Sequence, residues 1–466
     1  MNKIQRFFET AGIYFVGNIL SKLVSFFLLP LYTTRINPAQ YGNYDLVISL
    51  INLVAPIAFF QIWDGMFRFA FEVKKSKDKY QIINDTMIVF GCGLLPYILL
   101  FVGAYNYFQF EYFSYAIIYG ILFAIQYIYT YASRLFLRNK LFVFSGTANT
   151  ILTACSNVFL IAVLNWDVRS MYFSAAIGTM LQIIIIESQL HLFRNFSLRH
   201  LSFEICKKML KFSIPLCVAT ISYWLLSGFT KVMITKQLGA FENGLYAVSN
   251  RFSSMITIFV NVFQFAWNEM AYLMADEENR NEKYNLCVSL LFKTIMFGSA
   301  IAFLVAKLIF PFLVADQYSA AIDLIPISII GVALNSMAGF LGTLFMTEKK
   351  TSYILYSTVI SAAINIVLGR YLVEIWGLKG VVSALSIAFA MLMITRLLQL
   401  KNKFAIKISI KDLMIVIWVL IAVVTFYHNK SCIVDVLAIV LLGILYIFSI
   451  KDYIKTVFRF RKYNKL

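Results

Sequence analysis

A lysine near the centre of the first long apolar stretch of this chain is the residue best placed to carry chemistry. Lys22 is flanked on both sides by enough apolar residues to place it deep within a membrane helix. A Lys or Arg at the centre of such a helix costs about 2.5 to 3.5 kcal/mol on insertion scales and has to be compensated. We predict that Lys22 faces an internal cavity. Snorkelling of its ammonium group to an interface, or pairing within the helix, is the alternative.

Three further cations lie within apolar stretches, and we predict that they bind substrate together with Lys22. They are Lys231, Arg251 and Lys293. Each lies nearer the end of its stretch than Lys22 does, so snorkelling explains these three more easily. Because carboxylates at comparable depth are few, we expect the cavity to receive an anion. A phosphate or pyrophosphate head group fits, since ammonium and guanidinium groups give it charge-assisted hydrogen bonds.

Three charged residues near the second and eighth apolar stretches are candidates for coupling or gating. Asp64 and Arg68 are four residues apart, so on a helix they share one side and can form an ion pair. A structural pair and a functional site both remain open for these two residues. Glu269 is the carboxylate best placed to exchange a proton near the inner end of the eighth stretch.

Several other kinds of chemistry are not suggested by the sequence. No GxxxxGK[ST] loop is present, so nucleotide hydrolysis is not expected. The three histidines form no triad, and the six cysteines have neither CxxC nor Cys/His spacing, so we predict no metal, cofactor or catalytic site. The net charge of +18 is spread over many short segments, which argues against nucleic acid as a partner. We therefore do not expect an enzyme.

Apolar stretches long enough to span a membrane account for most of the chain. With 61% hydrophobic and only 14% charged residues, the composition suits a bilayer rather than a soluble core. Period-2 alternation is absent, so we predict an all-α polytopic protein whose helices satisfy their own backbone hydrogen bonds. The fourteen predicted spans are 11–32, 44–66, 82–105, 113–133, 142–164, 169–190, 211–235, 246–274, 286–310, 322–346, 351–374, 378–399, 411–427 and 433–450.

Basic residues are concentrated in every second gap between these spans. The tail before the first span and the even-numbered gaps hold most of the Lys and Arg, whereas the odd-numbered gaps hold few. By the positive-inside rule, the basic gaps lie in the cytoplasm. An even number of spans returns the chain to its starting side, so both ends are predicted to be cytoplasmic.

The first twelve predicted spans form two similar sets of six. FFQIWDGM at the second span returns as VFQFAWNEM at the eighth, and LFLRNK returns as LFMTEK, with a shift that grows from about 202 to 209 residues. Six crossings is an even number, so the two copies should be related by a pseudo-two-fold axis along the membrane normal. We predict an N-terminal six-helix lobe at 1–200, its repeat at 201–400, and two additional helices with a basic tail at 401–466.

Two segments resemble the polysaccharide flippases, the oligosaccharide-lipid branch of the multidrug, oligosaccharidyl-lipid and polysaccharide exporter superfamily. They are Asn18 to Tyr44, with its FFLLPLYTTRINPAQYGNYDL run, and the DGMFRFAFE segment that closes the second span. The resemblance implies a MATE-like V shape of two six-helix lobes with a basic cavity, which agrees with the cations named above. It also implies transfer of an undecaprenyl-pyrophosphate-linked repeat unit of O-antigen (lipopolysaccharide), capsule or exopolysaccharide across the bacterial plasma (inner) membrane by alternating access.

The implied partners are the lipid-linked oligosaccharide, membrane lipids, a polysaccharide polymerase and a chain-length regulator. Two other classes stay open, a cation-coupled multidrug antiporter of the MATE type and a membrane polysaccharide polymerase. Multidrug exporters of this superfamily usually carry an acidic residue in the first span, but none occurs between Glu9 and Asp45. The predicted outer gaps are too short for a catalytic domain. The 27 Tyr and 44 Phe could stack on sugars or simply pack the helices and form interfacial belts.

Overall fold

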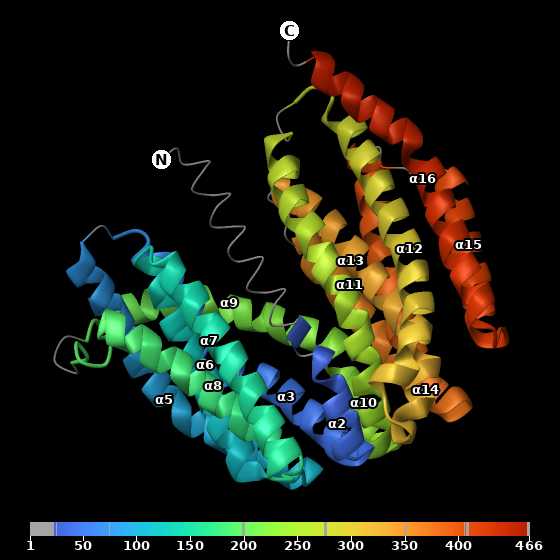
Figure 1. The fold of residues 1–466 in the computed structure, drawn as a ribbon. Coiled ribbons are helices and arrows are strands. Elements are labelled where there is room, and N and C mark those ends of the chain that lie inside the picture. Colours follow the sequence, from blue (N-terminus) through green and yellow to red (C-terminus); the bar gives the residue numbers. More distant parts are fainter. Residues whose placement is uncertain are drawn as a thin grey trace. The chain divides into compact units, whose positions relative to one another are not determined.

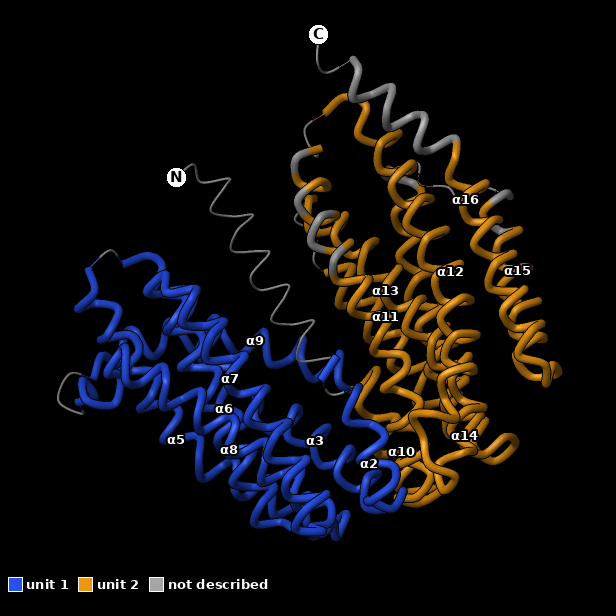
Figure 2. Tube along the Cα trace, viewed as in Figure 1, with its two compact units in different colours: residues 1–224 blue, residues 225–466 orange. Residues whose placement is uncertain are grey.

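The protein is all-helical in the part of the chain that the structure describes. The computed structural model describes residues 23–24, 26–73, 75–197, 201–274, 277–348, 350, 352–404, 406 and 410–463, and no strand occurs among them. The chain divides into two compact units, Met1–Trp224 and Leu225–Leu466, called here the first and second unit (Figure 2). The prediction of an all-α protein is confirmed.

The first unit is a bundle of helices (Figure 1). One predicted span within it is broken, and another is extended by a π-helical turn. Helix α3 has Pro38 at its first helical position, and the side chain of the preceding Asn37 accepts a hydrogen bond from the amide of Gln40. Both are common features of a helix start. The helices are α2 (Leu29–Arg35), α3 (Pro38–Ala58), α4 (Ile62–Ala70), α5 (Ser76–Phe108), α6 (Phe113–Leu135), α7 (Asn139–Val158, then π-helical Phe159–Val163), α8 (Arg169–Leu190) and α9 (Phe203–Ser227).

The second unit contains the longer helices. Gly377, with φ of 55° and ψ of −132°, bends α14 in the middle, a conformation that favours glycine. The elements are α10 (Phe229–Gln237), α11 (Ala240–Leu273), α12 (Arg280–Leu313), a 3₁₀ segment (Asp316–Leu324), α13 (Ile325–Thr347), α14 (Ser352–Phe404), α15 (Ile410–His428) and α16 (Cys432–Tyr463).

Many of these helices are long and apolar enough to cross a membrane. Among the described residues nine helices meet this criterion, or ten if the bent pair α3 and α4 is one span, so this is a multi-pass membrane protein. The predicted span 169–190 coincides with α8. The predicted total of fourteen is not confirmed. Most of 11–32 lies outside the described residues, 211–235 is divided between α9 and α10, and 351–374 and 378–399 form one bent helix, α14.

The last two helices are attached to α12 by buried ion pairs. The first pair lies near one end of the hairpin formed by α15 and α16. The Nζ of Lys293 lies 3.4 Å from a carboxylate oxygen of Asp412, in the first turn of α15, and donates to the carbonyl of Ser449 in α16. The hydroxyl of Ser289 also donates to Asp412. The side chains of the lysine and the aspartate are only 6% and 2% exposed, so each charge depends on the other.

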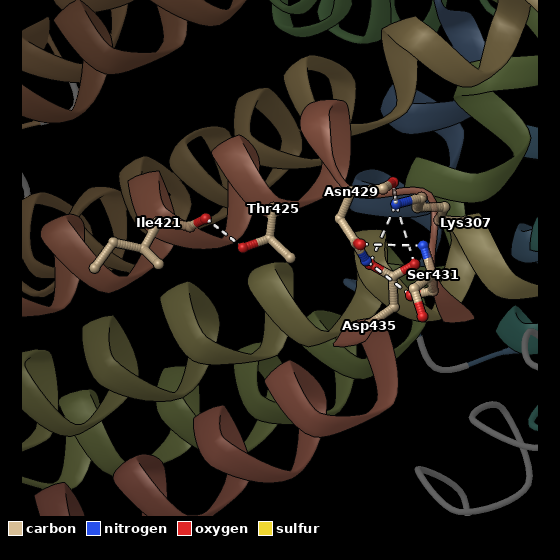
Figure 3. Close-up of polar contacts among 6 residues, drawn as sticks. All are labelled: Lys307, Ile421, Thr425, Asn429, Ser431 and Asp435. Atoms are coloured by element: carbon tan, nitrogen blue, oxygen red, sulfur yellow. Dashed lines mark hydrogen bonds and ion pairs between the residues drawn. The ribbon is translucent and has the colours of Figure 1, made fainter. Parts of the chain in front are cut away.

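A second ion pair holds the far end of the same helical hairpin. The Nζ of Lys307 lies 3.0 Å from Asp435, in the first turn of α16, and donates to the carbonyl of Asn429 at 2.7 Å (Figure 3). The amide of Asn429 also donates to Asp435. Lys293 and Lys307 are fourteen residues apart, which is about 21 Å along a helix. The hairpin of α15 and α16 is therefore fixed to α12 at two widely separated points.

Breaking one of these pairs should destabilise the protein, whereas exchanging the charges should restore much of the loss. Asp412→Asn leaves Lys293 buried without its counter-charge, and such a loss typically costs about 3 to 5 kcal/mol. We expect a clear drop in the unfolding temperature of the detergent-solubilised protein. The double variant Lys293→Asp with Asp412→Lys should recover part of it.

The matched control is Glu204→Gln, which removes the partner of Lys208 in an exposed pair four residues apart on α9. Exposed pairs contribute little, so this variant should unfold near the wild-type temperature. An unchanged unfolding temperature for Asp412→Asn would contradict the structural role of the buried pair.

Candidate functional site: a broken helix in the first unit

The predicted second span is interrupted where α3 meets α4. The two helices are separated by three residues and their axes differ by 56°. Phe60 and Gln61 both have left-handed backbone conformations, with φ of 53° and 47°, which non-glycine residues adopt rarely and at some cost. The break keeps its backbone hydrogen bonds, because the amide of Gln61 donates to the carbonyl of Pro56 at 2.8 Å. Broken helices of this kind occur in transporters at positions protected from lipid.

An aromatic slot on α5 holds the break from one side. The ring of Phe59 is stacked between those of Phe90 and Tyr97, at centroid distances of 4.3 and 5.4 Å. Gly93 lies between them on α5, and a Cβ atom there would come within 2.8 Å of the carbonyl oxygen of Ala58. The glycine therefore allows the close approach that seats Phe59.

A polar stripe on α9 holds the break from the other side. Its four residues lie at i, i+4, i+7 and i+11, so they share one face of the helix. Each hydrogen-bonds to the broken segment on one side of the interruption or within it. The pairs are Ser213 Oγ with the amide of Gly65, Cys217 Sγ with the carbonyl of Pro56, Thr220 Oγ1 with Gln61 Oε1, and Trp224 Nε1 with the carbonyl of Ser49.

Asp64 lies just after the break, in the first turn of α4. Its carboxylate accepts a hydrogen bond of 2.5 Å from Nε2 of Gln61 and another from the hydroxyl of Tyr131 on α6. The predicted ion pair between Asp64 and Arg68 is wrong. Arg68 lies on the exposed side of α4 and forms an ion pair with Glu72 at 2.8 Å. The carboxylate of Asp64 is instead hydrogen-bonded to the two neutral donors just named. Asp64 is therefore an ionisable group held within a polar cluster, and among the described residues no cation forms an ion pair with it.

The second unit repeats this cluster with a neutral amide in place of the carboxylate. Nε2 of Gln264 donates to Oδ1 of Asn268 at 2.7 Å, and Thr343 on α13 donates to the same oxygen. Gln264 and Asn268 are the residues that the sequence repeat pairs with Gln61 and Asp64. α11, however, runs through this point without interruption.

A second contact also recurs at equivalent positions. Tyr129 donates to Glu187 in the first unit, and Arg396 donates to the carbonyl of Ala338 in the second. Both partners are shifted by 209 residues, from 129 to 338 and from 187 to 396. These paired contacts support an internal duplication in which the helix packing is shared and the chemistry differs.

The predicted substrate-binding cations are not gathered into one cluster by the contacts of the described residues. Lys22 lies outside the described residues. Lys231 is on α10 and Arg251 on α11, both half-buried and on neighbouring helices of the second unit. Lys293 is engaged with Asp412, and these contacts favour a structural role for it over a cavity-facing one. Glu269 belongs to α11, but its side chain lies outside the described part of the chain.

Sequence reasoning missed the residues that surround Asp64. Gln61 lies in the interruption, Thr220 on α9 and Tyr131 on α6, and no local pattern links the three. The spacing of the polar stripe on α9 was a usable signal, because its hydroxyl, thiol and indole groups recur on one face of an apolar helix. Its partner helix could not be inferred from the spacing. Within the described part of the chain, no group of three or more His, Cys, Asp or Glu side chains could hold a metal ion.

Removing one donor of the polar stripe should weaken the support of the break. Thr220→Val keeps the shape of the side chain but leaves Gln61 Oε1 without this donor, which should lower the free energy of unfolding by about 1 kcal/mol. Thermal unfolding in detergent measures the change. Ser222→Ala is the control, because that hydroxyl donates only to the carbonyl of Val218 within α9. Equal effects of the two substitutions would contradict the role of the stripe.

Comparisons with known proteins agree with this fold. A structure of the lipid II flippase MurJ in an inward-closed conformation matches with a TM-score of 0.72 and 14% identity, covering 95% of this chain and 100% of that one. An inward-facing multidrug resistance MATE family transporter of the MOP superfamily matches with a TM-score of 0.65 and 12% identity, covering 88% of this chain and 96% of that one. A MOP superfamily transporter from Pyrococcus furiosus matches with a TM-score of 0.56 and 12% identity, covering 85% of this chain and 93% of that one.

At such low identities these likenesses establish the fold, a MurJ-like and MATE-like helical architecture. No curated protein sequence matches this chain significantly. The family model described as polysaccharide biosynthesis protein matches residues 8–267, which is more than half of the chain. This chain is therefore a member of the polysaccharide biosynthesis protein family.

Proposed function

We propose that this protein is a flippase that moves a lipid-linked oligosaccharide across the bacterial plasma membrane by alternating access. The observation that carries the proposal is that a member of the polysaccharide biosynthesis family shares its fold, over 95% of its length, with a lipid II flippase. Polysaccharide repeat units are built on lipid carriers and have to cross a bilayer. The proposed substrate is an undecaprenyl-pyrophosphate-linked repeat unit of O-antigen, capsule or exopolysaccharide.

Cationic side chains are the proposed binding groups for the pyrophosphate. Lys22 is the first candidate, and Lys231 and Arg251 are supported by their half-buried positions on the neighbouring helices α10 and α11. Away from bulk water, their hydrogen bonds to phosphate oxygens are strengthened by charge. The polyprenyl chain would stay in the lipid while the head group crosses. Lys293 is set aside, because its ammonium group is already paired with Asp412.

Asp64 is the proposed coupling or gating residue of the first unit. A carboxylic acid within a membrane helix is costly and usually functional, and this one lies beside a strained backbone interruption. Its equivalent in the second unit is Asn268, so the packing of the repeat does not require a charge at this position. A change in the ionisation of Asp64 would alter its hydrogen bonds with Gln61 and Tyr131 and thereby bias the angle between α3 and α4.

The two alternative functions are less well supported. A cation-coupled multidrug antiporter shares the fold, but the chain lacks an acidic residue between Glu9 and Asp45. A membrane polysaccharide polymerase would need an external catalytic domain. The loops of the described chain at the predicted outer side are short, such as the four residues between α5 and α6 and the five between the π-helical turn and α8. We propose cytoplasmic N- and C-termini, and a polymerase and chain-length regulator as partners.

Replacing Lys22 should stop transport without removing the protein from the membrane. Because a hydrogen bond to a charged group contributes about 1.5 to 3 kcal/mol, Lys22→Ala should reduce surface polysaccharide by about tenfold or more. The measurement is surface polysaccharide in the producing strain, with membrane abundance followed by immunoblot. Lys208→Ala, an exposed lysine on α9, is the control and should have normal polysaccharide. Normal polysaccharide in Lys22→Ala would remove the assignment.

Replacing Asp64 with Asn should separate a coupling role from a structural one. The substitution copies the arrangement of the second unit, so the fold and the hydrogen bond with Gln61 should persist. Transport by reconstituted protein should fall and lose its dependence on pH, because the ionisable group is gone. Transport of a fluorescent lipid-linked sugar in proteoliposomes at several pH values is the measurement. If the variant shows the wild-type pH profile, Asp64 does not couple transport.

A further inference from the structure

A regular series of aromatic rings runs along one face of α6. Its members are four residues apart, and such positions lie one above another on a helix. Neighbouring ring centroids are 6.1, 5.2 and 6.1 Å apart. All four side chains are half-buried. The members of this aromatic ladder are Tyr119, Phe123, Tyr127 and Tyr131.

Rings and polar groups of α4 and α6 complete the ladder. The indole of Trp63 stacks on Tyr127 at 4.9 Å, and the guanidinium of Arg134 lies over Phe67 at 4.8 Å and within 5.7 Å of the Tyr131 ring. Tyr131 donates to Asp64, whereas the hydroxyls of Tyr119 and Tyr127 donate to no group in the described part of the chain. The ladder therefore combines partly exposed aromatic surface with two hydroxyls that donate to no described group, a carboxylate and a cation.

Helix packing alone does not account for these rings. The repeat relation with a shift of 209 residues, fixed by LFLRNK and LFMTEK at the C-terminal ends of the two helices, gives each ladder residue a counterpart on α13. The counterparts are Ser328, Val332, Ser336 and Phe340. Both helices hold the same place in their bundle, since α6 contacts α4 as α13 contacts α11. A six-helix bundle of this type thus forms without the ladder.

A purely lipid-facing role does not account for them either. Aromatic residues of membrane proteins gather at the two interfaces, whereas this series continues over three helical turns between the ends of α6. It also meets Asp64, and ionisable groups in membrane spans avoid acyl chains and face the protein interior or water. The combination of rings with hydroxyl and carboxylate groups requires a ligand that has both apolar and hydrogen-bonding surfaces.

We propose that the aromatic ladder of α6 binds the sugar moiety of the transported lipid. A pyranose ring exposes C–H bonds on its faces, and these carry partial positive charge that is attracted to the negative face of an aromatic ring. Its hydroxyls meet the free hydroxyls of Tyr119 and Tyr127 and the carboxylate of Asp64. An aromatic ring at every turn would let a glycan move along the helix without a deep binding well. The inference rests on the proposed function and deepens it, because it assigns a binding surface to the glycan of the substrate in addition to the cations proposed for the pyrophosphate.

The experiment compares two probes on full-length protein in detergent. The first is undecaprenyl pyrophosphate without sugar, and the second is the same lipid carrying an N-acetylhexosamine disaccharide. Binding is measured for wild type and for Tyr119→Leu with Tyr127→Leu, which removes two rings but keeps apolar bulk. Phe144→Leu, an exposed ring on α7, is the matched control. A Tyr→Phe pair at 119 and 127 separates ring stacking from hydroxyl bonding, and thermal unfolding shows that each variant is folded.

The proposal expects the double Leu variant to bind the sugar-bearing lipid about tenfold more weakly than wild type, while binding of the bare lipid and the Phe144→Leu control stay unchanged. The double Phe variant should lose less affinity for the sugar-bearing lipid than the double Leu variant. Equal affinities of wild type and the Leu pair for the sugar-bearing lipid would overturn the ladder but leave the flippase proposal standing. If wild type binds neither lipid, the proposed function itself fails and the ladder fails with it.

Discussion

The absence of water in the hydrocarbon region imposes the constraint on which this structure depends, because every polar group placed there needs a partner within the protein. Regular helices meet it for most of the chain. Where α3 gives way to α4, the backbone is irregular, and α9 supplies hydrogen-bonding side chains along a single face to hold it. The interruption is thus a built feature. An ionisable carboxyl group, Asp64, lies in the first turn beyond it.

The same constraint explains how the second unit holds its last two helices. α15 and α16 have mostly exposed apolar surfaces, which lipid can cover as well as protein can, so apolar contact alone gives them little reason to stay on α12. Asp412 and Asp435 change this, because an acid in the first turn of a membrane helix is costly without a counter-charge. Lys293 and Lys307 provide that charge on one helix, and the hairpin acquires a single docked position.

The two units contain related contacts but different chemistry. Asp64 corresponds to Asn268, the aromatic ladder of α6 corresponds to a face of α13 rich in small residues, and the broken segment corresponds to a continuous helix. The second unit therefore shows which of these features the helix packing does not require. The features confined to the first unit are the ones for which packing gives no reason, and they are the carboxylate, the interruption and the aromatic ladder.

The sequence by itself determined the all-helical membrane architecture, the bounds of α8 and the repeat, because hydropathy and spacing are local properties of the chain. It also identified Asp64 as a residue of interest. Only the tertiary structure decided which partners the charges have. Asp64 and Arg68 share a helix face and still bind other groups, and Lys293 meets an acid more than a hundred residues away. The physical reason is that the energy of a buried charge is set by atoms brought close by packing between helices, and the order of residues along one helix does not contain that information.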